Sequence, residues 1–148
     1  MLYKKNLCGH LSFNSNKDYY FGSYSHFGMH EEMLSDEVRT HAYRDSIRQN
    51  RHLFEGKTVL DIGCGTGILS LFAVRDGGAK HVYAVDMADI NVFAKEIAKV
   101  NGYEKKITVI KGKIEDAKKL MPKHGIDVII SEWMGYFLVY ESMLDSII

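Results

Sequence analysis

Three closely spaced glycines follow a short apolar run in the segment VLDIGCGTG, residues 59–67. The apolar run favours a buried strand, and the apolar residues of 68–75 recur at helical spacing directly after the glycines. Because glycine lacks a Cβ, a strand–loop–helix junction of this kind lets the backbone approach a ligand closely. The segment therefore predicts a nucleotide-like ligand at the end of a β-strand.

The chain on either side of this junction alternates between short β-rich runs and longer helical stretches. The predicted strands are 58–62, 81–86, 107–110 and 126–131, and the predicted helices between them are 68–75 and 90–100, the latter with Val92, Phe93, Ile97 and Val100 at helical spacing. The strands are nearly all apolar, as in a parallel sheet covered by helices on both faces. We therefore predict an α/β fold with a doubly wound, mostly parallel, Rossmann-like sheet.

Residues 1–56 show no strand pattern and are predicted to form an N-terminal helical segment. Ser35, followed by Asp36 and Glu37, has the pattern of an N-cap with a negatively charged first turn, and the helix is expected to end near Asn50. The residues expected on its buried face are Leu34, Val38, Ala42, Tyr43 and Ile47.

Length and charge limit the possible functions. The chain has 148 residues, enough for one domain, and its 19 Lys+Arg balance 19 Asp+Glu, so no overall field attracts nucleic acid or an anionic membrane. Two cysteines make no disulfide framework, and no segment resembles a signal peptide or a membrane span of about 20 apolar residues. The expected protein is intracellular, with no membrane and no direct nucleic-acid partner.

The predicted sheet is short. Four strand runs are visible, whereas open nucleotide-binding sheets commonly have about six. Residues 141–148 begin an amphipathic helix without a C-cap glycine or a later strand. We expect a sheet truncated after its fourth strand, in which 57–148 is an incomplete Rossmann-like cofactor-binding domain from a longer protein.

The glycine loop and two nearby acids indicate which class of nucleotide-like ligand fits. Ile68 stands where a dinucleotide fingerprint has its third glycine, which disfavours NAD. Asp61 would repel a pyrophosphate but attract an ammonium or sulfonium, and Asp86, 19 residues after Gly67, could accept hydrogen bonds from ribose hydroxyls. The pattern favours S-adenosylmethionine, with a purely structural turn beside a strand-end acid as the alternative.

An aromatic loop with an acid near each end follows the fourth strand, as SEWMGYFLVYE at residues 131–141. Ligands of open α/β sheets bind in the crevice at the carboxyl ends of the strands. Glu132 and Glu141 could face a cationic substrate there, and a planar guanidinium with five donors matches a pair of carboxylates. The alternative is a buried helix with two solvated acids.

This loop, continued to Met143, resembles the double-glutamate loop of protein arginine N-methyltransferases of the asymmetric-dimethylating type. The resemblance extends to YFGSY at 20–24, FGMHEEML at 27–34, DEVRT at 36–40 and the glycine loop. It implies the N-terminal, cofactor-binding half of an enzyme that transfers the methyl group of S-adenosylmethionine to a guanidinium nitrogen of arginine in proteins. The products would be monomethylarginine, asymmetric dimethylarginine and S-adenosylhomocysteine; the family's C-terminal β-barrel with its histidine-containing proton relay is not in this sequence.

The resemblance also implies roles for particular residues. Arg39 would pair with the cofactor carboxylate, Asp86 would bind the ribose, and Glu132 and Glu141 would polarise the substrate guanidinium. The full set of implied cofactor-binding residues is His30, Arg39, Asp61, Gly63, Gly65, Asp86 and Glu115. The implied substrate-pocket residues are Tyr20 and Tyr24, on a lid over the cofactor site formed within 1–56, together with Met33 and Met143.

The implied partners are arginine-containing proteins, with histones and RNA-binding proteins as substrate classes, and a full-length homodimer in the cytoplasm or nucleus, linked to histone modification. No metal site is predicted, because position 33, where H-E-x-x-H would need histidine, is Met33. Two other functions stay open: a cofactor-binding or interaction fragment without turnover, and a methyltransferase with a different acceptor.

Overall fold

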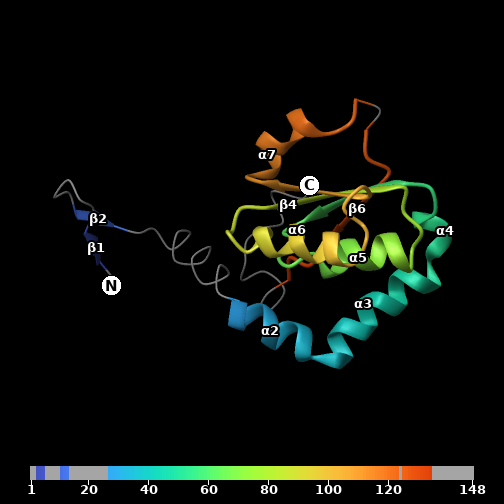
Figure 1. Ribbon diagram of the computed structural model, residues 1–148, viewed down its shortest axis with the longest axis horizontal. Coiled ribbons are helices and arrows are strands. Elements are labelled where there is room, and N and C mark those ends of the chain that lie inside the picture. The colour runs from blue at the N-terminus through green and yellow to red at the C-terminus, as the bar shows by residue number, and fades with distance from the viewer. Residues whose placement is uncertain (1–2, 6–10, 14–26, 124, 135–148) are drawn as a thin grey trace.

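A four-stranded parallel sheet forms the centre of the computed structural model, which describes residues 3–5, 11–13, 27–123 and 125–134 (Figure 1). Its strands are β3 (Thr58–Ile62), β4 (His81–Asp86), β5 (Ile107–Lys111) and β6 (Val128–Ser131), in the spatial order β5-β4-β3-β6. The chain thus runs outward from β3 through β4 to β5 and returns to the other side of β3 as β6. Open α/β sheets bind ligands at the crevice where the strand order reverses in this way.

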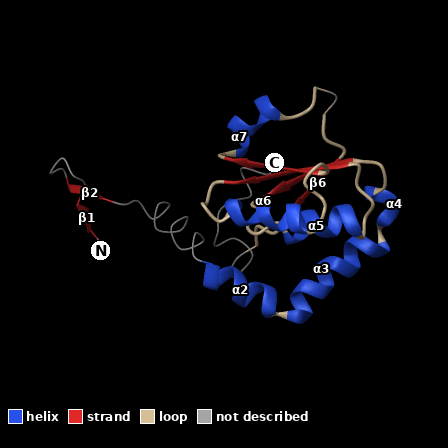
Figure 2. Cartoon of the chain, viewed as in Figure 1, coloured by secondary structure: helices blue, strands red, loops and turns tan. Residues whose placement is uncertain are grey.

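Helices lie on both faces of the sheet, as predicted (Figure 2). One face packs on α5 (Ile68–Arg75) and α6 (Asn91–Val100), and the other on α7 (Ile114–Ala117), which the 3-10 turn η1 (Lys118–Leu120) follows. Because successive strand residues point to opposite faces, Val59 joins the core on the α5 side whereas Leu60 and Ile62 join the core on the α7 side. Asp61 therefore shares the α5 side with Val59.

In the described part of the chain, three helices precede the sheet: α2 (Phe27–Ser35), α3 (Glu37–Gln49) and α4 (Arg51–Phe54). From residue 27 to 54 the chain is largely helical and α3 ends near Asn50, as predicted, but the predicted N-cap of α3 is wrong. The cap is Asp36, whose carboxylate accepts the N–H of Arg39 at 3.1 Å, while the Ser35 hydroxyl donates to the carbonyl of Glu31 at 2.7 Å and belongs to α2. No described helix is both long and apolar enough to cross a membrane.

The predicted buried face of α3 is wrong at two of its five positions, Val38 and Ala42, which are exposed. Ile47 is buried, but Val38 is 83% exposed, because α3 packs on α5 through its C-terminal part. In α6 the buried residues are Asn91, Ala94 and Ala98, and Ile97 is partly buried against the core, whereas Val92, Phe93 and Val100 are exposed. Small residues let α6 approach the glycine loop: a Cβ added at Gly67 would lie 3.3 Å from that of Ala94.

Two short strands correct the expectation that residues 1–56 contain none. β1 (Tyr3–Lys5) and β2 (Leu11–Phe13) pair antiparallel, with Lys4 opposite Ser12. A three-residue strand is too short to show the period-2 alternation on which a sequence prediction depends. The sequence therefore gives no signal for β1 and β2.

Gly77 sits where α3 and α4 pack on the end of α5. A Cβ added there would lie 2.7 Å from the Ala73 carbonyl oxygen, 2.9 Å from Phe54 Cβ and 3.0 Å from Ile47 Cγ2. We expect Gly77→Ala to lower the free energy of unfolding in urea by about 1–3 kcal/mol, because the helices must move apart. Gly28→Ala is the control: no atom lies within 4 Å of its added Cβ, so a similar loss there would contradict the packing explanation.

Candidate active site

The glycine loop connects β3 to α5 through residues with left-handed backbone angles. Gly63, Gly65 and Gly67 have φ values of 72°, 53° and 86°, and Gly67 is the residue before the first turn of α5. Gly63 and Cys64 donate their N–H groups to the Val85 carbonyl at 2.8 and 3.1 Å, and Gly67 donates to Cys64 at 2.8 Å. These donors are satisfied within the protein, so the loop is not a ready phosphate cradle, which agrees with the sequence argument against NAD.

Asp86 lies at the carboxyl end of β4, beside the loop, as predicted. Its Oδ2 accepts the N–H of Gly65 and its Oδ1 the N–H of Ala88, both at 2.8 Å, and Asn91 donates to its backbone carbonyl at 3.3 Å. These bonds fix the carboxylate while each oxygen keeps a further lone pair. The half-buried Asp86 can therefore accept hydrogen bonds from a diol without reorienting.

Asp61 is completely buried on the α5 side of the sheet. The Ser70 hydroxyl donates to its Oδ2 at 2.7 Å, and its Oδ1 has no partner among the described residues. Burial raises the pKa of the carboxyl to about 7; the Ser70 hydrogen bond opposes that rise, and the charge of Asp86 adds to it. A buried acceptor without a donor fits a cationic group of a ligand and does not fit a phosphate.

This raised pKa predicts how stability depends on pH. The folded protein binds the Asp61 proton more tightly than the unfolded chain, so the stabilisation is fully present below pH 3.8 and is lost as pH rises through about 7. Relative to Asp61→Asn, whose side chain does not ionise, we expect the parent chain to lose about 2–3 kcal/mol between pH 5 and pH 8. Urea unfolding of both proteins at the two pH values measures this, and parallel profiles would contradict it.

His30 brings α2 against the glycine loop. Its side chain is 6% exposed, and a Cβ added at Gly65 would lie 2.7 Å from its Cε1 atom. The ring therefore packs directly on the loop backbone, and only glycine fits opposite it. Two of the predicted cofactor-binding residues, from segments far apart in the sequence, are thus neighbours.

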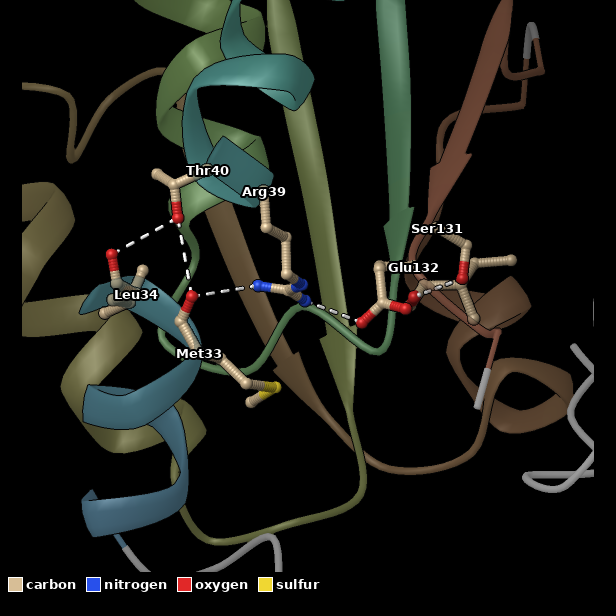
Figure 3. A network of polar contacts seen from close by, with 7 residues as sticks. Met33, Leu34, Arg39, Thr40, Ser131 and Glu132 are labelled. Atoms are coloured by element: carbon tan, nitrogen blue, oxygen red, sulfur yellow. Dashed lines mark hydrogen bonds and ion pairs between the residues drawn. The ribbon is translucent and has the colours of Figure 1, made fainter. Parts of the chain in front are cut away.

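An ion pair joins the N-terminal helices to the end of β6 (Figure 3). Arg39 Nη2 lies 2.7 Å from Glu132 Oε2, and its Nη1 donates to the Met33 carbonyl at 3.3 Å. The Thr40 hydroxyl also donates to that carbonyl, at 3.4 Å, which holds the α2–α3 junction beside the guanidinium. Arg39, predicted for the cofactor carboxylate, therefore contacts the acid predicted for the substrate.

The surroundings of this pair are partly buried. The Arg39 and Glu132 side chains are 29% and 23% exposed, and the Arg39 Cζ lies 5.6 Å from the centre of the Tyr43 ring. Burial raises the pKa of Tyr43, the Glu132 charge raises it further, and Arg39 opposes the rise. Ser131 fixes the adjacent end of β6 by donating to the Ile62 carbonyl at 2.7 Å.

Some of the other predicted site residues lie within the described chain, and the rest lie outside it. Met33 is half-buried next to Arg39, and Glu115 is exposed on α7, where its side chain forms no hydrogen bond or ion pair with the other candidates in the described ranges. The amide of Gly112, just before α7, donates to the Asp86 carbonyl at 2.9 Å and so connects the chain that leads into α7 to the end of β4. Tyr20, Tyr24, Glu141 and Met143 lie outside the described residues. Within those residues, no group of three His, Cys, Asp or Glu side chains could hold a metal ion.

Three polar residues of the site escaped the sequence analysis: Ser70, Thr40 and Ser131. The available signal was strongest for Ser70, because it is the one hydroxyl in the otherwise apolar run ILSLFAV at residues 68–74. A hydroxyl in a buried helix face needs a partner, and the nearest strand carries a buried acid.

Comparison with known proteins assigns the family. The model of a family described as a methyltransferase domain matches residues 53–146, which is more than half of the chain. The chain belongs to this methyltransferase-domain family. Its resemblance to protein arginine N-methyltransferases is also confirmed: protein arginine N-methyltransferase 1 of Schizosaccharomyces pombe is 60% identical over 132 residues, 89% of this chain and 38% of the relative.

Solved structures agree with the methyltransferase-domain assignment. The Trypanosoma brucei PRMT1 enzyme–prozyme heterotetrameric complex with AdoHcy matches with a TM-score of 0.77 and 54% identity, over 84% of this chain and 38% of that chain. Protein arginine methyltransferase 10 of Arabidopsis thaliana matches with a TM-score of 0.80 and 46% identity, over 86% and 36%. The chain therefore spans under two-fifths of the length of these relatives.

Proposed function

We propose that this methyltransferase domain binds S-adenosylmethionine and belongs to a protein arginine N-methyltransferase that modifies a guanidinium nitrogen of arginine in protein substrates. The observation that carries the proposal is the Arg39–Glu132 pair, with 2.7 Å between nitrogen and oxygen. It joins the arginine expected at the methionine end of the cofactor to a carboxylate that already accepts a guanidinium N–H. Identity of 60% to an arginine N-methyltransferase supports the same acceptor.

S-adenosylmethionine supplies an electrophilic methyl group on a sulfonium. The residues proposed to bind it are His30, Arg39, Asp61, Gly63, Gly65, Asp86 and Glu115. Asp86 can accept from both ribose hydroxyls because its carboxylate is already oriented by two backbone N–H groups. Arg39 can fix the cofactor carboxylate with a charge-assisted hydrogen bond, which sets the direction in which the methyl group points.

Glu132 acts on the substrate. Within the described chain its Oε1 accepts no hydrogen bond, so this oxygen can take an N–H of an incoming guanidinium. Together with Glu141 it would concentrate positive charge on the nitrogens that the two acids contact and leave the remaining nitrogen richer in electron density. That nitrogen attacks the methyl group, and the guanidinium proton leaves afterwards, since the methylated product stays strongly basic.

Product and substrate classes extend this proposal. Met33 and Met143, with Tyr20 and Tyr24, are proposed to line a pocket that allows monomethylarginine and then asymmetric dimethylarginine. Histones and RNA-binding proteins are the proposed substrates, a homodimer is the proposed assembly of the full-length protein, and the cytoplasm and nucleus are the proposed locations. Mass spectrometry of the methylated arginines distinguishes the asymmetric from the symmetric product.

Calorimetric titration with S-adenosylhomocysteine tests the cofactor site, with NAD as the control ligand. We expect saturable binding of the first and none of the second, because the N–H groups of Gly63, Cys64, Gly65 and Gly67 already donate within the protein and do not face a pyrophosphate. Transfer of labelled methyl groups to an arginine peptide, but not to the same peptide with lysine, tests the acceptor. Binding without transfer would favour a cofactor-binding or interaction fragment, and transfer to another acceptor would replace the proposed one.

A further inference from the structure

Ser70 and Asp61 form a buried polar pair in which one carboxylate oxygen of Asp61 lacks a hydrogen-bond donor among the described residues. Both side chains are 0% exposed, and the Ser70 hydroxyl donates to Asp61 Oδ2 at 2.7 Å. Asp61 Oδ1 is equally buried and has no partner in the described part of the chain. Leaving a buried carboxylate oxygen unpaired costs the desolvation energy of that group, so the arrangement is complete only when a donor reaches it.

The loop itself does not supply this donor. The N–H groups of Gly63, Cys64 and Gly67 go to backbone carbonyls, and the N–H of Gly65 goes to Asp86. The titratable groups around Asp61 are Asp86 from the end of β4 and Cys64 from the loop, with the His30 ring from α2 over Gly65. Asp86 is an acid and burial raises the pKa of the Cys64 thiol, so neither of these two groups balances the negative charge of Asp61.

We propose that Ser70 is a positioning residue that favours the ionised form of Asp61, with Oδ1 presented to the ammonium group of the methionine part of the cofactor. This inference rests on the proposed binding of S-adenosylmethionine. A serine hydroxyl suits the task because it donates to the carboxylate without adding a charge that would compete with the ligand. Cofactor binding is therefore coupled to loss of the Asp61 proton.

The coupling has a definite sign. Asp61 has a pKa of about 7, and the Ser70 hydrogen bond lowers it, so removing the hydroxyl raises it further. An ammonium prefers the ionised carboxylate. If the pKa rises by about one unit, the affinity of Ser70→Ala for S-adenosylhomocysteine is about tenfold weaker than that of the parent at pH 6 and within about twofold at pH 8.5.

The test is calorimetric titration of the whole chain, parent and Ser70→Ala, from pH 6 to pH 8.5. Asp86, Cys64 and His30 are present in both proteins, so the difference between the two profiles isolates the Ser70–Asp61 pair. Ser70→Thr keeps the hydroxyl and should restore the parent profile. Ser46→Ala, on α3 and exposed, is the matched control and should leave the profile unchanged.

A second ligand separates positioning from a general effect on the loop. 5′-Methylthioadenosine has the nucleoside of the cofactor but no ammonium, so we expect its affinity to be equal in the parent and Ser70→Ala at every pH. Equal weakening of both ligands would overturn the proposal, because it would show that Ser70 merely supports the loop.

A measurement on the parent protein covers the case in which Ser70→Ala does not fold. Titrations in two buffers of different ionisation enthalpy should show release of about half a proton on binding of S-adenosylhomocysteine at pH 7, falling towards zero at pH 8.5. Asp61→Asn should abolish this release. No binding to the parent at any pH would refute the proposed cofactor, whereas binding without proton release would refute the inference about Ser70 and leave the cofactor in place.

Discussion

Glu132→Gln is expected to lower methyl transfer to an arginine peptide by at least about a hundredfold while changing the affinity for S-adenosylhomocysteine by less than about threefold. The carboxylate is proposed to stabilise the guanidinium as charge shifts during attack, and an amide cannot supply that charge. Cofactor binding should persist because the glutamine carbonyl can still accept the Arg39 N–H that now lies 2.7 Å from Oε2. The substitution thus separates chemistry from binding.

Rates at saturating cofactor and peptide, together with calorimetry, measure both parts of this prediction. Glu96→Gln, an exposed acid on α6, is the matched control and should behave as the parent protein. Turnover that survives in Glu132→Gln would point to a different acceptor, since only a cationic guanidinium needs the carboxylate. Loss of cofactor affinity equal to the loss of turnover would show that Glu132 acts mainly by holding Arg39.

The ionised form of Asp61, near the carboxyl end of β3, lowers the stability of the fold and is also the form expected to bind a cationic ligand. Ionised Asp61 is buried with the Ser70 hydroxyl as its one side-chain donor among the described residues, and burial raises the pKa of this carboxyl to about 7. A bound cation that pairs with Asp61 would offset the free energy of folding that is lost when this carboxyl ionises. Replacing Asp61 by asparagine should therefore stabilise the empty protein at pH 8 and weaken its cofactor site, a trade common at functional sites.

The sheet could be predicted because each of its strands is marked locally. The run at 58–62 and the glycines after it place β3, the loop and α5 without any knowledge of tertiary contacts. The buried faces of α3 and α6 could not be predicted in the same way. Whether Val38 or Ala94 is buried depends on how closely each helix approaches its neighbours, and small residues here occupy the tightest contact.

The positions of some candidate residues at the strand ends could be predicted from the sequence, but the contacts between the candidates could not. Asp86 beside Gly65 follows from adjacent strand ends and a short loop. The pairing of Arg39 with Glu132 spans 93 positions and depends on how α2 and α3 fold back over the sheet, which no local pattern specifies. Ser70 was read as part of an apolar helix, although burial turns that hydroxyl into the partner of Asp61.

The substitution with the largest expected effect on cofactor binding is Asp86→Ala. It removes the proposed acceptor for the ribose and also the acceptor that fixes the N–H groups of Gly65 and Ala88, each at 2.8 Å. Two charge-assisted hydrogen bonds lost to the ligand, at about 1.5–3 kcal/mol each, correspond to a decrease in affinity for S-adenosylhomocysteine of at least about 100-fold. The unpaired N–H groups should lower the free energy of unfolding by about 1–3 kcal/mol.

Calorimetry and urea unfolding distinguish these two effects of Asp86→Ala. Asp89→Ala is the matched control, since its 74% exposed side chain pairs with Lys111 and takes no part in orienting the loop. Asp86→Asn keeps one carbonyl acceptor but opposes one backbone N–H with another donor, so its affinity should fall between those of the parent and Asp86→Ala. If Asp86→Ala loses stability but binds S-adenosylhomocysteine as the parent does, Asp86 orders the loop and does not contact the ribose.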